Sequence, residues 1–135
     1  MVDPDGLYAR SQGEKEYCRW IWNWNRCGQV AYLADIASRE ALRLYPNYLQ
    51  HNDRADAFRH CYWSGLMVNV LGYTWAKFFG DLHEDRVADQ SAAEKSMDLY
   101  NNSMGRSYGQ KNSTWKAIRN ACYWAANVGI LKIKP

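Results

Sequence analysis

The chain has 135 residues, of which 47% are hydrophobic and 23% are charged, and this composition fits one globular domain and excludes a disordered chain. Its net charge of +3 permits nucleic acid or an anionic membrane as a partner without requiring either. The longest uncharged stretch, Cys61 to Ala76, is shorter than the ~20 apolar residues of a spanning helix, so we expect no transmembrane segment, and the acidic start of the chain predicts no signal peptide.

Apolar residues at helical spacing occur along almost the whole chain. We expect a first helix at residues 13–24, an interruption at Gly28, and a second helix at residues 30–45 that Pro46 ends. Asp53 is a typical N-cap for a third helix, which ends near Leu71, before Gly72.

Three further helices are predicted at residues 74–83, 89–104 and 114–128. Gly105 and Gly129 stand where C-capping glycines are common, and Ser113 precedes the last helix as a cap. Residues 130–133 alone have the composition of a strand. The sequence therefore predicts an all-α protein, a single compact bundle of about five to six helices.

The four cysteines form no CxxC pair, which argues against a zinc knuckle or a thioredoxin-type motif. On one continuous helix, Cys18 and Cys27 would face opposite sides, about 13 Å apart along the axis, beyond the reach of a disulfide. We therefore expect buried free thiols, and we leave a Cys61–Cys122 bridge open.

The third predicted helix carries Asp56, Arg59 and His60. Asp56 and His60 are one helical turn apart, so the carboxylate can orient the imidazole and raise its pKa. Arg59 lies about 100° further round the helix and could point at an anionic group. One interpretation is a catalytic His60 with an orienting aspartate, and the alternative is a structural Asp–His pair.

Two later segments carry further candidates. His83 and Glu84 stand at the end of the fourth predicted helix, where they could enter a cleft. Asp98, Asn101 and Asn102 lie on the fifth, and two adjacent amides are unfavourable in a helix interior unless they serve a site. Side chains from several helices of one small bundle can meet in one cleft.

The chemistry of such a cleft has two alternatives. His60 and His83 could act as general base and general acid across a phosphodiester. Alternatively, His60, His83, Glu84 and Asp98 could hold a divalent metal that activates water. His51, in a loop, is the least favoured histidine.

Two resemblances to known families rest on specific residues. Val2-Asp3-Pro4-Asp5-Gly6-Leu7 resembles the segment that ends the core of Rhs/YD-repeat proteins, before their variable C-terminal toxin domains. Asn52-x3-Asp56-Ala57-Phe58-Arg59-His60-x2-Trp63, then His83-Glu84, then Met97-Asp98-Leu99-Tyr100-Asn101-Asn102-x2-Gly105-Arg106 resembles a domain of unassigned function in bacterial secreted proteins.

The second resemblance implies that the site consists of the shared polar residues, with Trp63 beside Asp98, Asn101 and Asn102 as substrate-binding candidates. The first implies a residual Rhs-core boundary at residues 1–12 and a toxin domain at residues 13–135. It also implies delivery into a target bacterial cell, to cytoplasm or periplasm, through the Rhs core and a secretion apparatus such as type VI. A cognate immunity protein would protect the producer, and we expect it to cover a face carrying Arg59, Arg86 and Arg106.

Three hypotheses for the function follow. The first is a toxin that hydrolyses a phosphodiester, most readily in nucleic acid, and it is favoured by the basic residues between Arg106 and Lys134. The second is an envelope-directed enzyme acting on phospholipid or peptidoglycan, favoured by Trp20, Trp22 and Trp24. The third is a non-enzymatic pore former or binding module.

Overall fold

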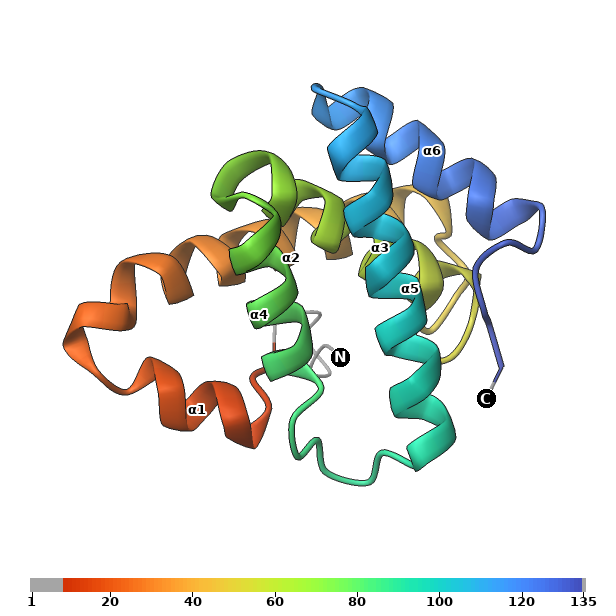
Figure 1. The fold of residues 1–135 in the computed structure, drawn as a ribbon. Coiled ribbons are helices and arrows are strands. Elements are labelled where there is room, and N and C mark those ends of the chain that lie inside the picture. The colour runs from red at the N-terminus through yellow and green to blue at the C-terminus, as the bar shows by residue number, and fades with distance from the viewer. Residues whose placement is uncertain (1–8, 135) are drawn as a thin grey trace.

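The computed structural model of the chain describes residues 9–134. The Rhs-like motif at residues 2–7 therefore lies outside the described residues. Within them the chain is all-α, as predicted, and contains no strand (Figure 1). The elements in chain order are α1 (Gln12–Cys18), the 3-10 turn η1 (Ile21–Asn23), α2 (Trp24–Leu44), α3 (Arg54–Leu71), α4 (Tyr73–His83), α5 (Ala92–Lys111) and α6 (Trp115–Asn127).

The helices are too short or too polar to cross a bilayer anywhere in residues 9–134. Residues 130–133, which the composition assigned to a strand, are irregular instead. They pack along α5, where Asn101 donates from Nδ2 to the carbonyl of Lys132 and accepts at Oδ1 from its amide, at 2.8 and 2.9 Å.

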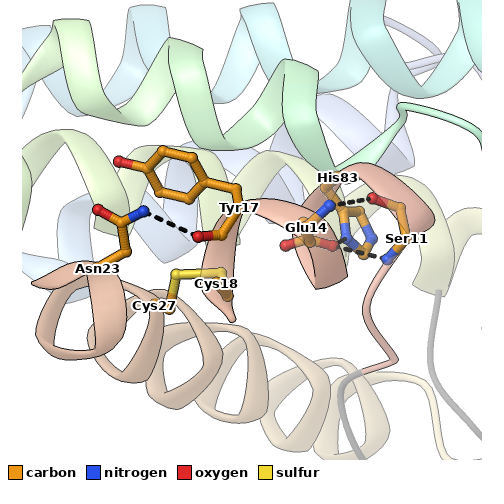
Figure 2. The surroundings of a disulfide bond; sticks show 7 residues. All are labelled: Ser11, Glu14, Tyr17, Cys18, Asn23, Cys27 and His83. Atoms are coloured by element: carbon orange, nitrogen blue, oxygen red, sulfur yellow. Dashed lines mark hydrogen bonds and ion pairs between the residues drawn. A yellow bond between two sulfur atoms is a disulfide. The ribbon is translucent and has the colours of Figure 1, made fainter. Parts of the chain in front are cut away.

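The first predicted helix is wrong at its C-terminal end. α1 stops at Cys18, and α2 begins at Trp24 and continues through Gly28 without interruption. The chain reverses between the two helices, so the Cα atoms of Cys18 and Cys27 lie 6.0 Å apart and a disulfide joins them (Figure 2). The expectation of free thiols fails because it assumed one continuous helix across both cysteines.

The second pair is also bridged: Cys61 of α3 forms a disulfide with Cys122 of α6. The possibility left open from the sequence is thus the observed pairing. The bond ties the central helix to the last one and lies fully inside the core.

α3 is the central helix, with α2, α4, α5 and α6 packed around it (Figure 1). Asp53 caps its first turn by accepting from the amide of Asp56, and Gly72 ends it at a φ of 90°, both as predicted. Every residue from Ala55 to Met67 is buried. A helix buried on all sides carries its polar residues into the interior with its apolar ones.

α5 is longer than predicted, because Gly105 lies inside the helix and does not cap it. A Cβ atom at Gly105 would stand 2.0 Å from the carbonyl oxygen of Cys61, and one at Gly109 would stand 2.7 Å from that of Gly65. The glycines therefore allow α3 and α5 to approach backbone to backbone. This close approach brings the polar residues of the two helices together.

Candidate functional site

Buried polar side chains from three elements meet beside α3. Asp56 and His60 come from α3, Glu84 follows α4, and Asp98 and Asn102 come from α5. Each of the five is less than 5% exposed. Burying polar groups costs free energy unless they are hydrogen-bonded or paired, so the several atoms of this cluster without a hydrogen-bond partner among the described residues mark it as a candidate site.

The His60 ring is surrounded by oxygen atoms. Its Nδ1 lies 3.1 Å from Oδ1 of Asn102 and 3.9 Å from Oε2 of Glu84. Because a carbonyl oxygen only accepts, Nδ1 carries the hydrogen. Nε2 then faces Oδ1 of Asp56 and Oδ1 of Asp98, each at 3.4 Å. Neither contact is a hydrogen bond, and Nε2 has no such partner among the described residues.

Asp56 is held by its own helix and by the preceding loop. Oδ2 accepts from the amide of Asn52 at 2.8 Å, and Oδ1 accepts from the guanidinium of Arg59. Asn52 has a φ of 53°, a left-handed conformation that asparagine tolerates better than most residues. The sequence predicted that Arg59 points at an anionic group. In the structure, Nη2 of its guanidinium is already paired with Asp56.

Gln90 joins the two remaining carboxylates. Its Nε2 donates to Oε1 of Glu84 at 2.8 Å and to Oδ2 of Asp98 at 3.0 Å. Glu84 and Asp98 each keep one buried oxygen without a hydrogen-bond partner in the described part of the chain. Sequence reasoning missed Gln90, because a glutamine in a loop carries no pattern that points to a site.

The charges in the cluster shift one another's pKa. Burial opposes ionisation of Asp56, but the charges of Arg59 and His60 outweigh it and hold the pKa of that carboxyl well below its usual range. Burial likewise opposes protonation of His60, but Asp98 and Asp56 outweigh it and raise the pKa of the imidazole. Burial raises the pKa of Asp98 to about 6, with His60 opposing the shift and Glu84 adding to it.

The donor set fits a divalent metal. Asp56, His60 and Asp98 each offer one ligand atom, and these three atoms lie within 4.8 Å of one another. Ligands about 2.0–2.2 Å from a tetrahedral ion stand roughly 3.3–3.6 Å apart, which agrees with the two 3.4 Å contacts of Nε2. An oxygen acceptor on the other ring nitrogen is the usual support of a metal-binding histidine, and Asn102 supplies it.

Two buried arginines border this cluster. Nη1 of Arg59, and Nε and Nη1 of Arg106, have no hydrogen-bond partner within residues 9–134. The guanidinium of Arg106 also lies 5.7 Å from the ring centre of Tyr73. The expected immunity face, with Arg59, Arg86 and Arg106 on it, is contradicted by the burial of Arg59 and Arg106. Only Arg86 of the three is exposed, and it pairs with Glu16 and Asp85.

His83 lies next to the cluster but is bound elsewhere. Its ring centre is 6.4 Å from that of His60, and its Nδ1 lies 2.6 Å from Oε1 of Glu14, which reaches across from α1 (Figure 2). Burial lowers the pKa of His83, and Glu14 opposes this shift. Sequence reasoning missed Glu14, which also completes the capping box of α1 with Ser11.

Two predicted candidates, Asn101 and Trp63, lie outside the cluster, and so does His51, the least favoured histidine. Asn101 binds the C-terminal segment, as described above. Trp63 is buried against His83, and its Nε1 donates to the carbonyl of Val30 at 3.2 Å. His51 is exposed and lies 3.9 Å from Glu94. Of the adjacent amides, Asn102 alone touches His60.

The fold and this arrangement define an all-α protein with a buried centre of one histidine and three carboxylates. Residues 20–128 match the family described as Domain of unknown function (DUF6973), and the chain belongs to that family. No solved structure matches the chain.

Proposed function

We propose that the chain is a hydrolase that cleaves a phosphodiester at the His60 centre, with a divalent cation held by Asp56, His60 and Asp98. The observation that carries this proposal is the position of Nε2 of His60, 3.4 Å from two carboxylate oxygens. In the neutral ring, with its hydrogen on Nδ1, the lone pair of Nε2 faces these two oxygens, and a cation there would take the place of the second proton that the raised pKa of His60 otherwise favours at Nε2.

A bound divalent cation supplies Lewis-acid activation of water and of a phosphoryl oxygen. The chain's own groups take the remaining tasks. Asn102 fixes the ring by accepting from Nδ1, and Gln90 fixes Glu84 and Asp98. Glu84 keeps Oε2 without a hydrogen-bond partner among the described residues, so this oxygen can take the proton of an attacking water.

The arginines support an anionic substrate. Arg59, which pairs with Asp56, and Arg106, one helical turn along α5 from Asn102, both keep buried guanidinium nitrogens without a hydrogen-bond partner among the described residues. Guanidinium groups pair with phosphate oxygens through charge-assisted hydrogen bonds. A phosphodiester would provide both the bond to hydrolyse and a negatively charged acceptor for these N–H donors.

The biological role that we propose is that of an Rhs-type toxin with a cognate immunity protein. Its support is the sequence resemblance at residues 2–7. Nucleic acid and phospholipid both offer a phosphodiester. The two disulfides favour phospholipid in the envelope, because thiols stay reduced in the cytosol and pair in the periplasm.

Expression of the chain in a bacterium, with and without a periplasmic export signal, tests this function. We expect killing after export, with loss of intact phospholipid, and we expect Asp98→Asn to abolish it. Asp81→Asn, which alters an exposed ion pair with Lys77 on α4, is the matched control and retains killing. Killing from the cytosol with nucleic-acid loss would reassign the substrate, and a fully toxic Asp98→Asn variant would refute the proposed centre.

A further inference from the structure

The turn between α1 and α2 exposes a group of large apolar side chains. Trp20 is 48% exposed, Ile21 65%, Trp22 72% and Trp24 57%. Figure 1 shows this turn at the left edge of the molecule. Single exposed apolar residues are ordinary, but four within five positions form a patch of the kind that marks an interaction surface.

This aromatic turn, residues 18–27, is held in one shape. The Cys18–Cys27 disulfide closes its base, and the side-chain amide of Asn23 donates to the carbonyl of Tyr17 at 2.8 Å (Figure 2). The rings of Trp20 and Trp22 stack at 5.3 Å with 10° between their planes. A rigid display of apolar groups loses little conformational entropy on binding.

The rim of the turn is basic. Residues 18–27 contain Arg19 and Arg26 and no acidic residue. The Arg19 guanidinium lies 5.4 Å from the ring centre of Trp20, and that of Arg26 lies 4.0 Å from the ring centre of Trp75 on α4. Both cations are therefore held at the level of the aromatic rings.

A pocket of about 380 Å³ continues the surface from the turn toward α3 and α4. Trp22 and Arg26 line it on one side, and Val70, Leu71 and Trp75 on the other. Val70 is itself 41% exposed. Asn25 and Gln29 line the pocket as well, so the surface beside the turn is a mixed apolar and polar groove that contains the Arg26 cation.

We propose that the aromatic turn docks on an anionic lipid surface. Tryptophan is enriched where a bilayer meets water, because its ring is apolar and its N–H is polar. Arginine beside such rings binds lipid phosphate, and each cation close to an anionic surface adds to the attraction. Stacking on nucleobases is less well served, because Trp20 and Trp22 already cover a face of each other.

This docking is independent of hydrolysis, so its test measures binding alone. The full chain is mixed, in the presence of a chelator, with sedimentable vesicles of phosphatidylcholine, and with vesicles containing equal parts of phosphatidylglycerol and phosphatidylcholine. We expect binding to the anionic vesicles. The double variant Trp20→Ser, Trp22→Ser should bind at least about tenfold more weakly, because it removes the apolar surface that enters the interface.

Trp124→Ser is the matched control, because Trp124 is 55% exposed on α6, outside the turn. It should bind like the wild type. The variant Arg19→Gln, Arg26→Gln should lose about tenfold on anionic vesicles and keep whatever binding phosphatidylcholine shows. All of the substituted residues are exposed, so we expect each variant to fold, and circular dichroism checks that it retains its helices.

Two results would overturn the proposal. One is a folded wild-type chain that does not sediment with either vesicle, or that loses as much binding in Trp124→Ser as in the double variant. The other is a dimer by analytical ultracentrifugation that dissociates in the double variant without vesicle binding, which would assign the surface to a second copy of the chain.

Discussion

At the scale of single residues, the two adjacent asparagines of α5 have different tasks. Asn102 accepts from Nδ1 of His60, whereas Asn101 binds the backbone of Lys132. The sequence predicted a shared role because the two amides stand side by side in an unusual place. Their helix turns successive side chains by about 100°, and the partners on either side of α5 decide which amide reaches the histidine.

We expect Asn102→Ala to weaken divalent-metal binding by about 10- to 100-fold, since it removes the support of the ligating ring. Asn102→Asp keeps an oxygen acceptor at Nδ1 and should restore binding. Asn101→Ala should leave metal affinity unchanged while lowering the melting temperature. Isothermal titration with Zn²⁺ and with Mn²⁺ distinguishes the three variants, and equal losses in Asn101→Ala and Asn102→Ala would contradict this assignment.

His83 gives a prediction for stability against pH. Burial lowers the pKa of its ring in the folded chain, whereas the unfolded value is about 6.5. The unfolded chain therefore binds more protons as the pH falls through that value, so this contribution to stability is complete above about pH 6.5 and is lost below it. His60, whose pKa is raised, has the opposite effect on how stability depends on pH. This effect is the same in the wild type and in a His83 variant, so it cancels in their comparison.

The comparison that isolates His83 is urea unfolding of the wild type and of His83→Gln at about pH 8 and about pH 5. We expect the wild type to lose more free energy of unfolding than the variant over this interval. An identical pH dependence in the two proteins would show that His83 does not resist protonation in the folded state.

At the scale of elements, the contact between α3 and α5 depends on glycine. A Cβ at Gly105 would overlap the carbonyl of Cys61, whereas one at Gly28 on α2 would meet nothing within 4 Å. We expect Gly105→Ala to destabilise the fold by more than about 2 kcal/mol, and Gly28→Ala to stabilise it by about 0.5–1 kcal/mol. Chemical denaturation measures both, and similar effects of the two changes would argue against close helix packing as the reason for Gly105.

The sequence predicted some of these elements well and others poorly. Asp53 and Gly72 bounded α3 correctly, because an N-cap and a glycine terminator act locally. Gly105 was misinterpreted as a cap, because a glycine that admits a neighbouring helix looks the same in sequence as one that ends its own. The shared face of Asp56 and His60 could be predicted, because it follows from their spacing on one helix. Gln90 and Glu14 could not be predicted, because only the tertiary fold brings them to Asp98 and His83.

At the scale of the whole molecule, two disulfides hold the bundle together. The bridged cysteines are 9 residues apart in the first and 61 apart in the second. In the chain-entropy account, the longer loop stabilises the fold by about 1.5–2 kcal/mol more. All four cysteines are buried, so the loss of either bridge also leaves a packing defect, and the difference in loop length decides the comparison.

We therefore expect Cys61→Ser, Cys122→Ser to lower the free energy of unfolding more than Cys18→Ser, Cys27→Ser. Urea unfolding under non-reducing conditions provides the comparison. A greater loss from the first pair would show that the shorter bridge limits the stability of the whole bundle, contrary to this account.

We propose that Asp56, His60 and Asp98 together hold one divalent cation. The most direct measurement is the metal content of the chelator-treated chain after dialysis against Zn²⁺, Mn²⁺ or Mg²⁺, read by elemental mass spectrometry. We expect one ion per wild-type chain for at least one of these metals, and none retained by folded His60→Gln or Asp98→Asn. A folded wild-type chain that retains none of the three metals, or variants that retain as much as the wild type, would contradict it.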